Sequence, residues 1–211
     1  TKLIKNLLDN DFITFRDYEV LKNQRIKLKK KKRIFLEDSQ FYIEDVRKTV
    51  IEKLTYEKVY KQGFNINTPI NLELQKIATD SLRKGLISYD KRKGWRGPIK
   101  SKNLKKNWYN NLEKYELEKS IGWKIAIIKK VDQFSALIET KNKIKGFINY
   151  DDISWTKKEF DELIRPGDIV YVKKIKNNNY SLKQIPKLNG GIVVMDPYTG
   201  RVLALSGGFS F

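Results

Sequence analysis

The chain has 211 residues, enough for one or two domains, and its 44 Lys and Arg residues against 25 Asp and Glu residues give a net charge of +19. It contains no Cys and no His, which excludes disulfides, thiol chemistry and the side chain most often used as general base or metal ligand. No apolar run approaches the roughly 18 residues of a membrane-spanning helix, and we expect no signal peptide within it.

The positive charge would suit phosphate backbones or anionic lipid. However, the basic residues mostly lie beside acids or on polar helix faces, and Lys, Ile and Asn are abundant throughout the sequence. This distribution favours a general compositional bias over nucleic-acid binding as the origin of the charge.

Two short helices are predicted near the start of the chain. Apolar residues recur at helical spacing over residues 3–8. Thr14 followed by Asp17 resembles a capping box, with Asp in place of Glu or Gln, and opens a second helix. The basic run at 27–33 is interpreted as a solvated linker, with contact to acidic lipid or nucleic acid as the alternative.

A longer helical region follows. An amphipathic helix is predicted over residues 39–54, and one further turn ends at Gly63. Residues 64–68 alternate apolar and polar side chains, which indicates a half-buried strand that ends at Pro69.

Asn71 can cap the next helix, whose apolar face extends to about Tyr89. The sequence Gly-Trp-Arg-Gly-Pro at 94–98 breaks this pattern and is the expected domain boundary. Residues 103–119 are polar and irregular, with partly helical character around their large apolar side chains, Trp108, Leu112 and Tyr115.

Residues 122–185 are predicted to form one small unit of five strands and a short helix. Three strands precede residues 151–163, where Trp155, Phe160 and Leu163 are spaced for one side of a helix, and two strands follow. This order is that of an OB-fold, a small Greek-key barrel, and an open five-stranded sheet with the same order is the alternative. The predicted strands are 122–131, 134–139, 144–148, 169–172 and 180–185.

The final segment predicts a β-hairpin. Apolar runs at 190–195 and 201–208 flank the turn Asp-Pro-Tyr-Thr-Gly, and their continuous apolar character indicates a buried sheet. A lone hairpin is marginally stable in water, so we expect the strand at 64–68 to join it. The predicted fold class is therefore α+β, with an OB-like five-stranded β-barrel inserted between helical and strand segments of another domain.

Several ordered motifs resemble the class A penicillin-binding proteins, closest to their 1A group. The resemblance departs from the family pattern at residues 68–71, where a Thr-Leu-Asp type of turn is usual. It covers most of the chain and rests on the order of its motifs: Asp11 to Glu19, Phe41 to Arg47, Val59 to Gly63, Leu74 to Leu86, Gly94 to Pro98, Gln184 to Pro186 and Gly191 to Gly208.

This resemblance implies a membrane-anchored enzyme at the periplasmic face of the bacterial inner membrane, which polymerises glycan strands and cross-links peptide stems. Because both ends of the chain look cut, we expect a fragment of the larger enzyme. The glycosyltransferase glutamates should precede Thr1 and the transpeptidase nucleophile should follow Phe211. No residue of this chain is therefore assigned to catalysis, to a cofactor or to a metal, and the fragment is expected to be inactive alone.

The resemblance also implies a division into domains. Residues 1–38 would be a helical linker after the glycosyltransferase domain. Residues 39–94 and 188–211 would form the N-terminal part of the transpeptidase domain, with the OB-like domain, residues 95–187, inserted between them. Its barrel core would be residues 122–185.

Three strings match the S-x-x-K motif of the transpeptidases, in which a Ser and a Lys three apart on a helix can meet. The companion motifs are missing, because the chain has no K-T-G strand and its only S-x-N lies in the loop at 101–103. We interpret all three as coincidental: Ser81 to Lys84, Ser88 to Lys91 and Ser154 to Lys157.

Two functions remain open for the OB-like domain. It could be a docking platform for envelope proteins or peptidoglycan, or a spacer, and we favour this class because it needs no catalytic site. Alternatively, it could bind single-stranded nucleic acid, with aromatic side chains stacking on bases beside lysines. Against this, Phe134 and Phe147 are expected in the barrel core and Trp155 against the helix cap. The candidate residues are Trp123, Phe134, Phe147, Tyr150 and Trp155, with Lys124, Lys130, Lys143 and Lys145.

Overall fold

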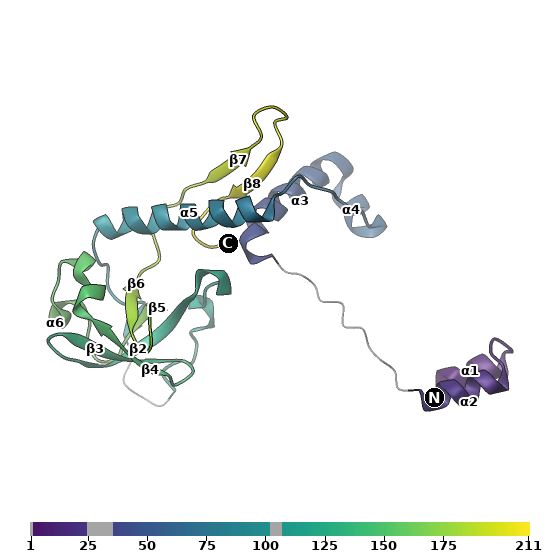
Figure 1. The fold of residues 1–211 in the computed structure, drawn as a ribbon, viewed down its shortest axis with the longest axis horizontal. Helices are drawn as coiled ribbons and strands as arrows, with labels where there is room; N and C mark the ends of the chain where they lie inside the picture. Colours follow the sequence, from purple (N-terminus) through teal and green to yellow (C-terminus); the bar gives the residue numbers. More distant parts are fainter. Residues whose placement is uncertain (1, 25–35, 102–106) are drawn as a thin grey trace. The chain divides into compact units, whose positions relative to one another are not determined.

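The computed structural model describes residues 2–24, 36–101 and 107–211, which fall into two units, 1–35 and 36–211 (Figure 1). In the first unit, α1 (Lys2–Asp9) packs against α2 (Phe15–Asn23). The predicted capping box is confirmed, since the Asp17 N–H donates to Thr14 Oγ1 at 3.2 Å and Asp17 Oδ2 accepts from the Thr14 N–H at 3.2 Å. The basic run at 27–33 lies outside the described residues.

The second unit begins with η1 (Glu37–Ser39), α3 (Gln40–Leu54) and α4 (Tyr56–Gln62), as the amphipathic pattern predicted. The helix α5 (Leu72–Arg92) extends three residues beyond the expected end. Two N–H groups of its first turn, those of Glu73 and Leu74, donate to the Asn71 side chain, both at 3.0 Å. None of the helices in the described ranges combines the length and apolar character needed to cross a membrane.

The predicted strand at 64–68 is wrong. These residues form no strand and belong to neither sheet, and the Phe64 and Ile66 side chains are 44% and 47% exposed. The connection to the hairpin lies further along, where the Asn71 N–H donates to the Leu203 carbonyl at 2.9 Å. An alternating pattern without a face to bury does not hold a strand in place.

The main sheet contains the five predicted strands and one short addition, and all of its strand pairs are antiparallel. Its order is β1-β5-β2-β3-β4, with β6 also paired to β5. The sheet is open, so the predicted closure into a barrel is not confirmed. The strands are β1 (Lys100–Ser101), β2 (Trp123–Val131), β3 (Ser135–Thr140), β4 (Lys145–Asn149), β5 (Asp168–Lys174) and β6 (Tyr180–Lys183).

The edges formed by β4 and β6 approach each other without forming a ladder. One isolated bridge joins Phe147 to Asn179, and the Phe147 N–H donates to the Asn178 carbonyl at 2.8 Å. The Tyr180 ring covers Gly146 so closely that an added Cβ would lie 2.4 Å from the ring carbon Cε2. Packing of a buried aromatic ring onto a glycine thus occupies part of the gap between the two edges.

The interior of this sheet follows the alternation of its strands. Positions 136, 138 and 140 in β3 and 146 and 148 in β4 are buried, and the core continues into β5 and β6. The helix predicted for 151–163 is broken. It consists of the 3-10 turns η4 (Tyr150–Asp152) and η5 (Ser154–Thr156) and the single turn α6 (Phe160–Leu163), whose two terminal side chains are buried.

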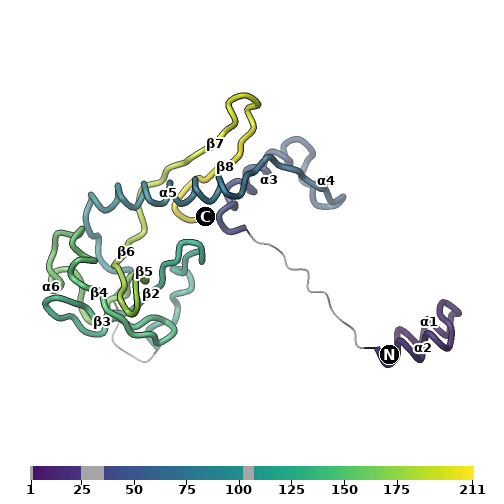
Figure 2. Tube along the Cα trace, in the orientation of Figure 1, coloured from purple at the N-terminus to yellow at the C-terminus, as the bar shows by residue number. Residues whose placement is uncertain are grey.

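The predicted hairpin is present as β7 (Ile192–Met195) and β8 (Val202–Ser206), which pack beside α5 (Figure 2). Its expected complete burial is wrong. Ala204 and Ser206 in β8 are buried, whereas Val193 and Met195 in β7 are 58% and 56% exposed. Only one face of this two-stranded sheet is covered by the described helices.

A buried charge cluster joins α5 to three other segments. The Arg83 guanidinium donates to Asp38 at 3.0 Å, to Glu118 at 2.8 Å and to the Phe209 carbonyl at 3.0 Å. Glu118 also accepts from the Phe211 N–H at 2.7 Å. Because Arg83 is 7% exposed, this cluster fixes the loop before β2 against both α5 and the residues that follow β8.

A second cluster forms where the chain enters and leaves the region of the main sheet. The Asp90 carboxylate, 3% exposed, accepts from Arg96 and Gln184 side chains, both at 2.8 Å, and from the Lys187 N–H at 3.2 Å. Arg96 donates in addition to the Ile185 carbonyl at 2.7 Å. One carboxylate at the end of α5 therefore holds both connecting segments.

Candidate functional site

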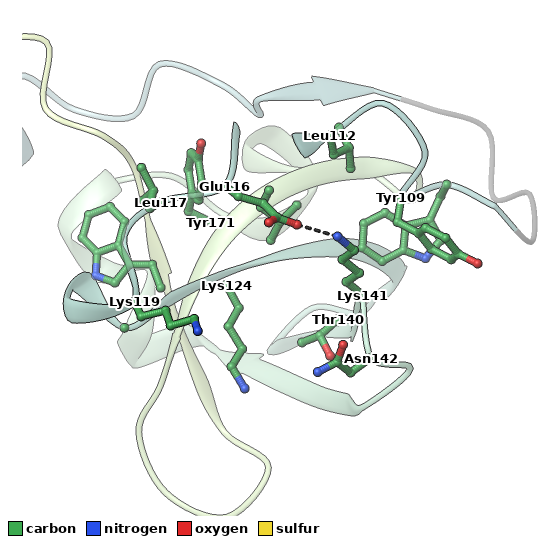
Figure 3. Close-up of a pocket in the computed structure, with 14 residues that line it drawn as sticks. Tyr109, Leu112, Glu116, Leu117, Lys119, Lys124, Thr140, Lys141, Asn142 and Tyr171 are labelled. Carbon is green, nitrogen blue, oxygen red and sulfur yellow. Dashed lines mark hydrogen bonds and ion pairs between the residues drawn. The ribbon is translucent and has the colours of Figure 1, made fainter. Parts of the chain in front are cut away.

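A groove of about 400 Å³ lies between β2, β5 and the segment 108–119 (Figure 3). We call it the aromatic groove. Its lining is mainly apolar, with polar side chains at the rim. The apolar part consists of Trp108, Tyr109, Leu112, Leu117, Gly122, Trp123, Ile125 and Tyr171, and the polar part of Glu116, Lys119, Lys124, Thr140, Lys141 and Asn142.

Strand geometry places the apolar floor. Trp123 and Ile125 lie two residues apart on β2 and so point to the same face, and Tyr171 of β5 pairs with Ile125 in the ladder. Gly122 adopts φ +70°, a left-handed conformation that turns the chain from the preceding 3-10 helix into β2. A bulky side chain at Gly122 would be strained in this turn.

The segment 108–117 closes one side of the groove. Trp108 and Leu112 are 2% and 3% exposed and pack on Ile127 and Ile169, whereas Tyr109 is half-buried. The Trp108 indole Nε1 donates to Glu139 Oε1 at 3.2 Å. Burial of these large side chains holds an otherwise irregular segment against the sheet.

Tyr171 ties the floor to this segment. Its hydroxyl donates to the Tyr115 carbonyl at 2.7 Å, and burial raises the pKa of the Tyr171 phenol to about 12. The phenol therefore stays neutral at physiological pH and acts as a structural donor. The position of Tyr171 gives no indication of a role in acid–base catalysis.

Two kinds of charge line the rim. Glu116 and Lys141 form an ion pair at 2.5 Å, and this contact raises the pKa of the Lys141 ammonium. In Figure 3, Lys119 lies at the left and Lys124 extends downwards, both apart from that pair. Within the described residues neither Lys119 nor Lys124 has an acidic partner, so the rim keeps two uncompensated cations.

Trp123 connects the aromatic groove to the small apolar core beside it. Its ring lies 5.0 Å from the Phe209 ring and 6.2 Å from the Tyr171 ring, centroid to centroid. Phe209 packs with Leu86 and Ile121 in a small core shared by α5 and the segment before β2. A ligand that moved Trp123 would therefore press on residues that follow β8.

The structure does not gather the predicted stacking residues into one site. Trp123 and Lys124 line the aromatic groove, but Phe134 and Phe147 do not, and their predicted place in the core is wrong at 70% and 43% exposure. In β4 the inward positions belong to Gly146 and Ile148, which puts Phe147 on the outer face.

The remaining candidates are dispersed as well. Tyr150 donates its hydroxyl to Glu159 at 3.0 Å, and Trp155 packs edge-on against Trp95 at 6.1 Å. Lys130 pairs with Asp132 at 2.8 Å, so it is not free for a phosphate. Lys143 lies in the β3–β4 turn with φ +59°, and Lys145 is exposed on β4.

The serines of the S-x-x-K strings occupy ordinary surface positions. Ser81 and Ser88 are exposed on α5, and the Ser154 hydroxyl donates to the Asp151 carbonyl at 3.0 Å. Sequence reasoning missed the groove itself, because Trp108, Leu112 and Tyr171 come from segments far apart in the chain. The one available signal was the spacing of the large apolar residues in 103–119.

Comparisons with known proteins agree with this architecture. The family model described as the penicillin-binding protein OB-like domain matches residues 95–188. Penicillin-binding protein 1A of Rickettsia bellii is 33% identical over 99% of this chain, and that of Pseudomonas aeruginosa is 26% identical over 73% of it. The chain spans 27% and 20% of the length of these two relatives.

A crystal structure of penicillin-binding protein 1A from Haemophilus influenzae superimposes on 98% of this chain and 31% of its own, with a TM-score of 0.71 and 23% identity. That likeness supports the fold of the chain. The Rickettsia bellii relative aligns with nearly the whole chain, 99% of it. The chain therefore belongs to the class A penicillin-binding proteins and carries their OB-like domain.

Proposed function

We propose that this chain is a non-catalytic segment of a bifunctional peptidoglycan glycosyltransferase and DD-transpeptidase, at the periplasmic face of the inner membrane. In this proposal its OB-like domain docks an envelope protein through the aromatic groove. The observation that carries the docking role is the groove's construction: an apolar floor and a rim with two unpaired lysines. Such a surface suits binding, and it offers no nucleophile next to a general base.

The chemistry of the groove defines the partner. A bulky apolar side chain would fill the floor beside Trp123 and Ile125, where water is poorly accommodated. Carboxylates next to that side chain would meet Lys119 and Lys124, which would speed association and fix its direction. The proposed partner is thus a protein with an acidic segment that contains at least one large apolar residue.

Charge reversal at the rim tests this proposal. Lys119→Glu combined with Lys124→Glu should weaken capture of an envelope protein by at least about tenfold, since both contacts become repulsive. Lys174→Glu combined with Lys176→Glu makes the same charge change on exposed residues outside the groove and should leave capture nearly unchanged. The captured protein is then purified and its Kd measured for both variants.

The full-length enzyme gives the functional measurement. Deletion of the OB-like domain should lower peptidoglycan cross-linking, and the rim variant should reproduce that loss. Capture of no envelope protein by the OB-like domain, together with unchanged cross-linking after its deletion, would count against docking and leave a spacer role. Retention on purified peptidoglycan that is lost in the rim variant would instead identify the glycan as the partner.

Single-stranded nucleic acid is the competing ligand. It would show affinity that falls steeply with salt and disappears when Trp or Phe residues are replaced. The dispersal of Phe134, Phe147, Tyr150 and Trp155 disfavours it, because successive bases need aromatic rings along one continuous groove.

A further inference from the structure

A second hollow, of about 390 Å³, lies at the C-terminal end of α5 and shares no lining residue with the aromatic groove. We call it the basic pocket. Among the described residues that line it there are four cationic side chains and no carboxylate. The cations are Lys91, Arg92, Lys93 and Lys157, and the other lining residues are Gly94, Trp155 and Thr156.

Aromatic rings hold three of these cations in place. The Lys91 Nζ lies over the Trp155 ring, 5.3 Å from its centroid. Arg92 and Lys93 lie over the Tyr89 ring at 4.8 and 5.7 Å. No acid in the described ranges pairs with any of the four, so cation–π contacts position the charges without neutralising them.

Neighbouring groups add to the positive potential. Lys183 on β6 faces Lys91, Lys173 and Asp152, and burial followed by repulsion from the two lysines lowers its pKa to about 8. Burial also lowers the pKa of Lys91, against the attraction of Asp152. Burial raises the pKa of Asp152, the carboxylate whose charge attracts both Lys183 and Lys91. Cations are thus crowded here beyond what the nearby acid offsets.

We propose that the basic pocket binds a phosphate group. A carboxylate would neutralise one of the four cations, whereas a phosphate carries up to two negative charges and three strong acceptor oxygens. Lysine ammonium groups bind phosphate as point charges and need no bidentate geometry. The phosphate could belong to a soluble anion or to a lipid headgroup, and the same chemistry would recognise either.

Titration of the 211-residue chain tests the site, with inorganic pyrophosphate as the soluble probe and calorimetry as the readout. The variant Lys91→Gln with Lys157→Gln should lose at least about tenfold in affinity, because it removes two lining cations. Lys174→Gln with Lys176→Gln removes the same charge from exposed residues and should lose less than about twofold. Thermal unfolding of both variants verifies that they remain folded.

Vesicles identify the source of the phosphate. Flotation with phosphatidylglycerol vesicles, compared with phosphatidylcholine vesicles, should retain the native chain and release the Lys91→Gln, Lys157→Gln variant if the ligand is a lipid headgroup. Pyrophosphate binding without vesicle binding identifies a soluble ligand. The proposal would be overturned if the pocket and control variants lost affinity for the probe equally. It would also be overturned if the native chain bound neither pyrophosphate nor vesicles.

The titration of Lys183 supplies an independent readout. Affinity for pyrophosphate should decline as pH rises from 7 to 9, because Lys183 then loses its proton. Lys183→Arg keeps its charge over that range and should bind more tightly than the native chain at pH 9, while the probe's own titration is the same for both. Identical pH profiles for the two chains would contradict the positive potential that Lys183 is inferred to add at the basic pocket.

Discussion

At the scale of single residues, the closest packing in the main sheet is between Gly146 and Tyr180. Gly146→Ala would place a Cβ 2.4 Å from the Tyr180 ring and 2.5 Å from the Asn178 carbonyl, and the backbone atom cannot swing away. We expect the free energy of unfolding to fall by about 1–3 kcal/mol, as for other overpacked cores. Urea unfolding provides the measurement.

A matched glycine serves as the control for this prediction. Gly85 lies inside α5 with nothing within 4 Å of an added Cβ. Gly85→Ala should therefore stabilise the chain by roughly 0.5–1 kcal/mol. Equal effects of the two substitutions would mean that Tyr180 does not cover Gly146 in solution.

Lys183 gives a pH-dependent prediction of stability. Its folded pKa of about 8 lies below its ordinary value of 10.5, so between these values the unfolded chain holds a proton that the folded chain has released. The free energy of unfolding should therefore gain a rising contribution as pH increases from about 8, and Lys183→Met should remove that rise. Urea unfolding of both chains at pH 7.5 and 9.5 measures the difference. A rise that persists unchanged in Lys183→Met would assign it to another group.

Arg83 is the central residue of the buried charge cluster that joins α5 to three other segments. Arg83→Met would leave Asp38 and Glu118, 25% and 14% exposed, without their cation, and should cost on the order of 3 kcal/mol in unfolding free energy. Lys76→Met breaks an exposed pair with Asp80 and should cost well under about 1 kcal/mol. Equal shifts of the denaturant midpoint in both variants would contradict a stabilising role of the buried charge cluster around Arg83.

At the scale of elements, the sequence predicted local structure well because each signal was local. The Thr14 cap, the Asn71 cap and the alternating strands of the main sheet depend on residues within a few positions of one another. The strand at 64–68 failed because its pattern required a neighbouring strand, whereas the backbone bond to β8 comes from Asn71, beyond the predicted strand. Phe147 was misplaced because its face depends on the position of Gly146, which the Tyr180 ring determines.

The candidate sites were less predictable than the elements. Trp123 and Lys124 were identified as ligand-binding candidates for an aromatic and basic surface, and both line the aromatic groove. Their neighbours come from β5 and from the segment 108–117, so only the folded chain shows the groove. The basic pocket likewise joins the end of α5 to η5, which lie some 60 residues apart in sequence.

At the scale of the whole second unit, Asp90 determines how the OB-like domain is attached. Its carboxylate receives hydrogen bonds from both connecting segments, at Arg96 and at 184–187. Asp90→Ala should loosen both connections and increase proteolysis at 94–98 and 184–188 several-fold without changing helical content. Circular dichroism with timed proteolysis measures both effects.

Asp80→Ala is the control for that experiment, since it removes an exposed carboxylate from the same helix. Proteolysis at the two connections should match that of the native chain. If the rate of proteolysis is also unchanged in Asp90→Ala, packing around Leu86 and Ile121 is sufficient to hold the OB-like domain.

The length of α5 gives this attachment a mechanical meaning. A helix of 21 residues is about 31 Å long, and Asp90 fastens one end of it to the OB-like domain. If the domain and helix turn together by about 5° around that end, the Asn71 end sweeps through about 3 Å. Asn71 is bonded to the backbone of β8, so the helix would act as a lever arm. A small tilt of the OB-like domain imposed by a bound partner would then displace the hairpin by about the length of a hydrogen bond.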